Sequence, residues 1–436
     1  PMTVEQKKRM FKLLVKLGFK QIEVGFPAAS QPDFDFVRAL IEETMIPDDV
    51  TVQVLTQARE HLIDKTIEAL AGAKQAIVHV YNSTSKVQRE QVFRMEKQQI
   101  IDLAVSGVRM VKERVVNHPD TKWRLEYSPE SFTGTEVDFA VEICDAVVAE
   151  WQPTTDNKII LNLPATVEMS TPNLFADQIE YFCNNVQQRD KIEVSLHTHN
   201  DRGCGVAAAE LGLMAGADRV EGTLMGNGER TGNMDVITLA MNLYSQGVDP
   251  QLNLADVEEI IEVYEACTNL PVHPRHPYIG ELVYTAFSGS HQDAIKKSLD
   301  CQTEEDGWNV AYLPIDPKDL GRSYEAVIRI NSQSGKGGVA YVLEEDYGLQ
   351  IPRWLQPEVA QKVQAQTEKL ERELQRAEIY AVFEQAYLTK DDKARLVNYR
   401  LARNGEDTLE ATLSYQGKEW QLAASGKGVL HALSQG

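Results

Sequence analysis

The chain has 436 residues, 43% hydrophobic and 25% charged, a composition typical of a globular protein with one large domain and smaller ones. Its net charge of −21 at pH 7 repels nucleic acid and anionic membranes, and no basic patch offsets this locally. The longest apolar stretches are strand-length, well below the ~20 residues of a membrane-spanning helix. We therefore expect a cytoplasmic protein with neither nucleic-acid nor membrane partners.

The cysteines indicate neither a disulfide framework nor a zinc knuckle. There are five of them, an odd number, and they are scattered without a CxxC pair. We expect them to be packing residues in a reducing environment. They are Cys144, Cys183, Cys204, Cys267 and Cys301.

Residues 1–250 alternate between helical and strand periodicity, which predicts a parallel sheet wrapped by helices. Seven helix–strand pairs can be counted along this stretch. The predicted helices are 3–18, 33–45, 58–73, 86–117, 135–151, 172–187 and 204–216, and the predicted strands are 21–26, 50–56, 76–82, 123–128, 158–164, 192–199 and 219–227.

A closed barrel of this type has eight strands, each followed by a helix, whereas this chain opens in a helix. Thr3 and Gln6 have the spacing of a capping pair at the start of that helix. We interpret residues 1–250 as an α/β fold, a (β/α)8 TIM barrel that lacks its first strand. The alternative is an open sheet of seven strands.

The remaining sequence predicts two further regions. Residues 251–390 are mixed α/β linker subdomains and include one long amphipathic helix over 357–388. Residues 394–422 predict two strands joined at Asn404–Gly405, a strong hairpin signal, and "GVLHAL" then favours a helix. Residues 391–436 are too few for a core of their own, so we expect the beginning of another domain.

The segment "SLHTHNDRGCG" places His197 and His199 two residues apart near the end of a predicted strand. Side chains at this spacing project to the same face of a strand. The carboxyl ends of the strands form the mouth of a barrel, where its active site lies. The pair therefore favours a metal site over two structural histidines, because a metal binds imidazole in its neutral form.

The next predicted strand ends in "GNGERTGN", so Glu229 or Asn233 could reach an ion held by the two histidines. The competing interpretation is a tight turn whose asparagines cap backbone groups. Two imidazoles and an amide carry no negative charge, whereas a catalytic divalent ion usually keeps a carboxylate. Asp201 or the absent first strand could supply it.

Other polar residues lie at or just beyond the ends of predicted strands, and each could instead cap or hydrogen-bond the backbone. The segment "SGKGG" at 334–338 lacks the spacing of a phosphate-binding loop, so we reject nucleotide binding. The remaining candidates for the barrel mouth are His79, Tyr81, Glu130, Asn162 and Thr166.

Three stretches carry a specific resemblance that covers nearly the whole chain. "LHTHNDRGCGVAAAELGLMAGADRVEGTLMGNGERTGN", "PMTVEQKKRMFKLLVKLGFKQIEVGFPAASQPDFDFVR" and "DLGRSYEAVIRINSQSGKGG" resemble the longer, fungal-like and actinobacterial-like branch of the 2-isopropylmalate synthases. That family belongs to the TIM-barrel aldol and Claisen enzymes, with homocitrate and citramalate synthases and hydroxymethylglutaryl-CoA lyase.

The resemblance implies an acyltransferase that condenses acetyl-CoA with 2-oxoisovalerate to 2-isopropylmalate and CoA, the first committed step of leucine synthesis. The alternatives are an acyltransferase for another 2-oxo acid and a non-catalytic homologue. The resemblance also implies a divalent metal (Mg²⁺, Mn²⁺ or Zn²⁺), a possible monovalent cation activator and a homodimer.

The resemblance also assigns roles to particular residues. His197, His199 and Asn233 correspond to metal ligands, and Thr166 to the group that holds the keto-acid carboxylate. Catalytic roles fall on Glu130, Glu229, His291 in "SGSHQD" and Tyr324 in "GRSYE", the last two entering the barrel of a partner subunit. The substrate pocket would be lined by His79, Tyr81, Ser128 and Asn162.

Two departures from the family pattern affect these expectations. The family's first strand ends in an Arg-Asp-Gly-Asn-Gln motif that supplies a metal-binding aspartate and an arginine, and this sequence begins after that motif. Residues 391–436 correspond only to the opening of the leucine-binding regulatory domain. We therefore expect impaired catalysis and absent or damaged leucine feedback from the chain as it stands.

Overall fold

The computed structural model describes residues 2–286, 288–303, 307–322, 336–370, 372, 374–388, 394–403, 407–429 and 431–432. They fall into two compact units. The first comprises residues 1–284, 305–309 and 313–325, and the second comprises 285–304, 310–312 and 326–436.

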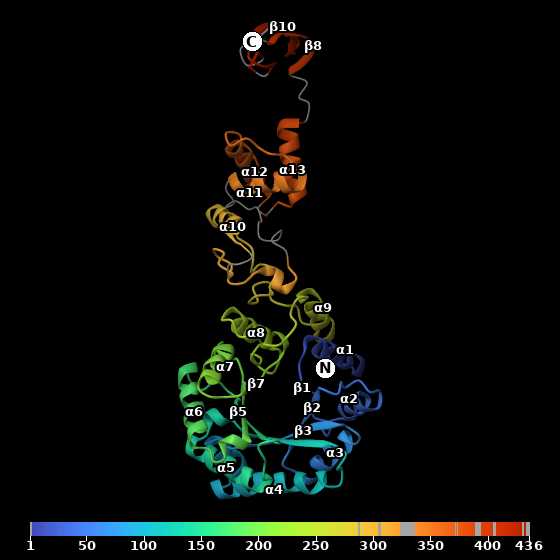
Figure 1. The fold of residues 1–436 in the computed structure, drawn as a ribbon, viewed down its shortest axis with the longest axis vertical. Helices are drawn as coiled ribbons and strands as arrows, with labels where there is room; N and C mark the ends of the chain where they lie inside the picture. The colour runs from blue at the N-terminus through green and yellow to red at the C-terminus, as the bar shows by residue number, and fades with distance from the viewer. Residues whose placement is uncertain are drawn as a thin grey trace. The chain divides into compact units, whose positions relative to one another are not determined.

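The first unit is built on a seven-stranded parallel sheet in which strand order follows chain order. Figure 1 shows the sheet curling, with the helices on its outer side. The fold class predicted from the alternating periodicities is therefore confirmed. The strands are β1 (Gln21–Glu23), β2 (Thr51–Gln57), β3 (Gln75–Ser83), β4 (Lys122–Glu130), β5 (Ile159–Ala165), β6 (Ile192–Thr198) and β7 (Arg219–Glu221).

The main apolar core lies between this sheet and its helices. Alternate strand residues such as Val52, Val54 and Leu161 are fully buried there, because successive side chains of a strand point to opposite faces. The other strand positions face the concave side and are mostly polar. The helices are α1 (Val4–Leu17), α2 (Gln31–Glu42), α3 (Glu60–Leu70), α4 (Lys97–Val115), α5 (Val137–Trp151), α6 (Pro172–Asn185), α7 (Gly205–Met214) and α8 (Val236–Ser245).

A further helix, α9 (Val257–Thr268), packs against α1. It thereby joins a segment that follows the sheet to the first helix of the chain. Gln6 donates to the backbone oxygen of Ala266, and Arg9 pairs with Glu262. Thr3 caps α1 in a capping box with Gln6, as the spacing of the two residues predicts.

Two predicted elements of the first unit have different boundaries in the structure. The helical segments expected over 86–117 are a π-helical turn, Gln88–Phe93, and α4, which are separate because Arg94 has a φ of 55° and Glu96 caps a new helix. The expected strand over 219–227 ends at Glu221, after which Leu224–Gly226 forms a 3-10 turn.

The second unit contains α10 (Gly289–Cys301) and a small core shared by α11 (Lys336–Tyr347), α12 (Gln356–Leu370) and α13 (Arg376–Phe383). The prediction of one helix over 357–388 is wrong. A new capping box at Gln375 and Glu378 starts α13. The break allows Val363 of α12 and Ile379 of α13 to bury their side chains in the same core.

The C-terminal sheet has three antiparallel strands, where two were predicted. Gln416 and Gly417 both have positive φ, 51° and 79°, which suits a two-residue hairpin turn. Gln416-Gly417 is the sequence signal for this second turn, which the two-strand prediction does not include, and the predicted turn at Asn404–Gly405 lies outside the described residues. The strands are β8 (Ala394–Arg403), β9 (Asp407–Tyr415) and β10 (Lys418–Gly426). Among the described residues, no helix is long and apolar enough to cross a membrane.

The contact between α4 and the start of α3 gives a test of the packing. A Cβ added at Gly107 would lie 2.6 Å from the Cβ of buried Ala58. We expect Gly107→Ala to lower the free energy of unfolding by roughly 1–3 kcal/mol, because overpacking outweighs the gain in helix propensity. Urea denaturation measures this change. Ser106→Ala, on the exposed side of the same helix, is the control, and equal stability of the two variants would contradict the packing.

Candidate metal and substrate site

The three predicted metal ligands lie together where β6 ends. His197 and His199 have their ring centroids 5.2 Å apart, and the Nε2 atom of His197 is 2.9 Å from Oδ1 of Asn233. The loop that carries Asn233 is fixed beside β6 by backbone pairing, since Met234 donates to Thr198 and Asn200 donates to Gly232. The tertiary fold thus brings together residues that are 36 positions apart.

His197 is oriented by a carboxylate at its second nitrogen. Its Nδ1 is 3.0 Å from Oε2 of Glu221 on β7, the carboxylate–histidine arrangement that commonly supports a metal ligand. Burial disfavours protonation, but Glu221 outweighs it and raises the pKa of His197. Both ring nitrogens face acceptor oxygens, Oε2 of Glu221 and Oδ1 of Asn233, and a cation bound between Nε2 and Asn233 would take the place of a proton on Nε2. The donors fit a divalent ion.

His199 has a different environment. Burial lowers its pKa to about 4, assisted by the charges of His197 and Arg230, so its ring is neutral. Arg230 from the loop after β7 reaches its Nδ1 at 2.7 Å and also pairs with Asp201 at 2.8 Å. Asp201, the predicted carboxylate candidate, is thus engaged by an arginine.

A chain of buried hydrogen bonds joins three of the predicted substrate-pocket residues. Nε2 of His79 lies 2.6 Å from the Ser128 hydroxyl, which also accepts from Nδ2 of Asn162 at 3.0 Å. All three residues are at most 5% exposed. The Oδ1 atom of Asn162 is buried with no hydrogen-bond partner among the described residues, so a ligand donor could satisfy it.

The other predicted site residues lie around this group with separate partners. Tyr81 accepts from Gln57, Glu130 accepts from Ser83, and Thr166 accepts from the backbone of Ser131. These contacts fix the three side chains at or just beyond the carboxyl ends of β3, β4 and β5.

Two predicted catalytic residues are not brought to this mouth by the described contacts. The Glu229 side chain is 88% exposed and its carboxylate lies 3.9 Å from Arg230. His291, in the second unit, is exposed and stacks on Tyr312 with centroids 4.1 Å apart. Tyr324 lies outside the described residues.

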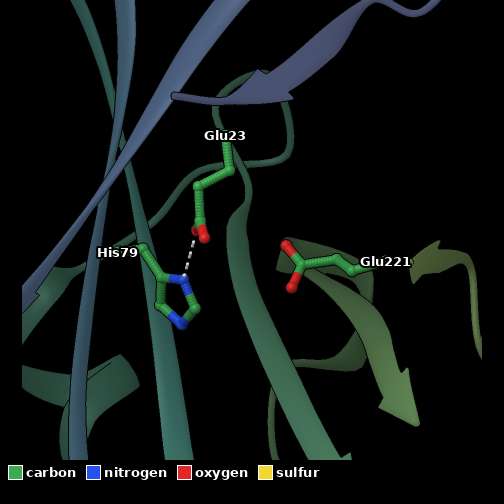
Figure 2. A group of neighbouring side chains, drawn as sticks. All are labelled: Glu23, His79 and Glu221. Atoms are coloured by element: carbon green, nitrogen blue, oxygen red, sulfur yellow. Dashed lines mark hydrogen bonds and ion pairs between the residues drawn. The ribbon is translucent and has the colours of Figure 1, made fainter. Parts of the chain in front are cut away.

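Next to the metal ligands lies a group of charged side chains that the sequence interpretation missed; His79 and Glu126 are buried in it, whereas Glu23 is exposed. Figure 2 shows Glu23, His79 and Glu221 converging on one another from β1, β3 and β7. Arg219 donates to Glu221 at 2.7 Å, and its guanidinium is 3.5 Å from Glu126, whose side chain is completely buried. Alternation of polar residues in "RLEYS" and "RVEGT" could have revealed this inward-facing layer.

The ionisation of this group follows from burial and neighbours. Burial, together with the charge of Glu221, raises the pKa of Glu126 well above its ordinary value. Burial opposes ionisation of Glu221 as well, but Arg219 and then His197 hold its pKa well below the usual range. Burial likewise disfavours a charged His79, yet the Glu126 charge above all raises its pKa to about 9.

This pKa bears on whether the same group holds a metal. Glu23, His79 and Glu221 offer ligand atoms that all lie within 4.8 Å of one another. A protonated imidazole has no lone pair for a metal, and at neutral pH His79 is protonated. His79 would have to lose this proton to bind a metal, and Glu221 is already engaged by Arg219, Gln53 and Nδ1 of His197. We therefore interpret this group as an ion network and keep the metal assignment at His197, His199 and Asn233.

Comparison with known proteins agrees with this architecture. Residues 1–263 match the HMGL-like family model, and residues 281–344 match the alpha-isopropylmalate synthase post-catalytic domain-like model. A solved HMG-CoA lyase from Brucella melitensis is 15% identical, with a TM-score of 0.47 over 61% of this chain and 92% of that one. Because the HMGL-like model matches more than half of the chain, the chain belongs to that family, a divalent-metal-dependent class of enzymes.

The curated relatives narrow the class. The chain is 55% identical over 440 residues to 2-isopropylmalate synthase of Pseudomonas putida (strain GB-1), covering 100% of this chain and 79% of the relative. It is 57% identical over 434 residues to the enzyme of the same name from Azotobacter vinelandii, covering 99% of this chain and 78% of the relative. The chain belongs to the 2-isopropylmalate synthase family.

The ion network predicts a large stability cost for removing its internal cation. Arg219→Met would leave Glu221 and Glu126 without their guanidinium, and we expect a loss of about 3–5 kcal/mol in the free energy of unfolding. Arg9→Met removes an exposed pair with Glu262 and should cost under ~1 kcal/mol. Urea denaturation of both variants compares the two losses, and similar values would contradict the network.

The raised pKa of His79 predicts a pH-dependent stability. Since the folded-state pKa of about 9 exceeds the ordinary 6.5, its contribution is fully present below pH 6.5 and is lost as the pH rises through about 9. The loss amounts to at most ~3 kcal/mol. We expect His79→Gln to reduce the fall in unfolding free energy between pH 6.5 and about 9, as measured by urea denaturation. The control is His61→Gln, a change of an exposed histidine on α3, which should leave the fall unchanged. Parallel curves for all three proteins would refute the assignment.

Proposed function

We propose that this protein condenses acetyl-CoA with 2-oxoisovalerate and hydrolyses the thioester, releasing 2-isopropylmalate and CoA in leucine biosynthesis. The observation that carries the proposal is the 55% identity to a 2-isopropylmalate synthase along the whole chain. The site chemistry is consistent with it. The buried polar side chains of His79, Ser128 and Asn162, beside imidazole and amide ligands, suit a small, chelating 2-oxo acid.

In this proposal His197, His199 and Asn233 hold the divalent ion. When bound, the ion acts as a Lewis acid that polarises the keto carbonyl and stabilises the alkoxide formed on attack. Glu221 holds the His197 ring in place through Nδ1. Thr166 binds the carboxylate of the 2-oxo acid, and its hydroxyl is fixed by the backbone amide of Ser131.

The remaining residues bind substrate and move protons. His79, Ser128 and Asn162 line the pocket through their shared hydrogen bonds, and Tyr81 completes its wall. Glu130 is the proposed general base for the acetyl methyl proton, a carboxylate at the carboxyl end of β4 that accepts from Ser83. Removal of that proton gives the carbanion that attacks the keto carbon.

A second copy of the chain completes the proposed site. Glu229, His291 and Tyr324 are assigned catalytic roles on the basis of family resemblance, the last two acting in the partner subunit's barrel. The exposed position of His291 in the second unit leaves its ring available for such a role. A homodimer is therefore part of the proposal.

The substrate assay tests this function against its alternatives. The chain is assayed as given and as a chimaera completed to the length of a curated relative, with acetyl-CoA, Mg²⁺ or Mn²⁺, and 2-oxoisovalerate, pyruvate or 2-oxoglutarate. Products are quantified by mass spectrometry, because the chain's own free cysteines would react with thiol reagents. We expect 2-isopropylmalate to be the main product, with yield lost in EDTA.

Two controls sharpen the result. Asn233→Ala should abolish product formation, whereas Asn253→Ala, in the segment before α9, should not. A preference for pyruvate or 2-oxoglutarate would reassign the substrate within the family. No product from either chain with any 2-oxo acid would support the non-catalytic alternative.

A further inference from the structure

The contact between Arg230 and His199 bears directly on metal loading. A neutral imidazole has one N–H and one lone pair. Arginine only donates hydrogen bonds, so its approach to 2.7 Å from Nδ1 of His199 uses that lone pair. The proton then resides on Nε2. Whichever ring nitrogen would coordinate a metal, the ring has no second lone pair to offer.

Arg230 is held in this position by a specific set of partners. Its guanidinium donates to both carboxylate oxygens of Asp201, at 2.8 and 3.2 Å, and to the backbone oxygen of Thr166. Its backbone has a φ of 54°, an uncommon conformation for a residue other than glycine. Four acceptor atoms from the ends of two strands, β5 and β6, thus fix one side chain against the ligand ring.

We propose that Arg230 occupies the ligand lone pair of His199 in the metal-free protein and must release it when a divalent ion binds. The inference rests on the proposed assignment of His199 as a metal ligand. Release requires the guanidinium to move away from Nδ1 of His199, and because the same Nη2 atom also donates to Thr166 and Asp201, those bonds rearrange with it. Arg230 is therefore a positioning residue whose contact with His199 lowers the affinity of the site for a metal ion. The ion must replace this hydrogen bond before His199 can coordinate it.

Metal affinity, measured by isothermal titration of the metal-free protein with Mn²⁺, tests this competition. Arg230→Met removes the competing donor, and we expect Mn²⁺ to bind roughly tenfold more tightly, about 1.4 kcal/mol. Arg202→Met is the matched control, since it removes one exposed positive charge from the loop after β6. We expect less than a twofold change there. Thermal melts confirm that both variants fold.

A second measurement reports on the ring itself. In ¹⁵N-histidine NMR spectra of the metal-free protein, His199 should be the Nε2–H tautomer with Nδ1 accepting a hydrogen bond. Its Nδ1 resonance should move to that of a non-bonded nitrogen in Arg230→Met but not in Arg202→Met. An Nδ1–H tautomer in the metal-free protein would overturn the inference.

The outcomes separate this inference from the metal-site proposal. If His199→Ala binds Mn²⁺ as well as the unmodified protein, the ligand assignment fails and the inference falls with it. If His199→Ala loses binding but Arg230→Met binds no more tightly than Arg202→Met, only the inference fails. Weaker binding by Arg230→Met would show that Arg230 supports the ion, which also overturns it.

Discussion

The guanidinium of Arg219 is the interaction on which the inside of the barrel unit depends. It donates to Gln21, Gln53, Ser195 and Glu221 at 2.7–2.9 Å, and so connects β7 with β6, β1 and β2. Buried carboxylates are costly without a compensating charge. This cation, with the neighbouring His197 and His79, allows Glu221 to remain ionised within the concave face of the sheet.

The geometry of the mouth follows from that ionised carboxylate. Glu221 accepts from Gln53 at 2.8 Å on one oxygen and contacts Nδ1 of His197 at 3.0 Å on the other. It thereby orients the ring that faces Asn233. On β3, His79 contacts Glu23 and the Ser128 hydroxyl, which in turn accepts from Asn162. The network thus extends to the predicted substrate-binding residues on β4 and β5. The positions of the proposed metal ligand His197 and of the proposed substrate-binding residues thus depend on the same network of charged side chains.

This arrangement places the apolar core and the site residues on opposite faces of the sheet. Barrel interiors are commonly filled by branched apolar side chains, whereas here the concave face is polar. The apolar core lies instead on the convex face, where strand residues such as Val54 and Leu196 pack beneath the helices. Polar changes on the concave face therefore alter chemistry without opening that core, provided that charge remains balanced.

The sequence by itself determined the alternating parallel fold and the polar residues at the strand ends, because both depend on local periodicity and on the common edge of parallel strands. It also located the His197, His199 and Asn233 group. Only the tertiary structure decided that Glu221 orients the His197 ring and that the Arg230 guanidinium contacts Nδ1 of His199. Those contacts join separate loops and strands, and neither register nor side-chain direction between distant segments is encoded in local spacing. The break between α12 and α13 has the same origin, since burial in a shared core overrode a continuous helical pattern.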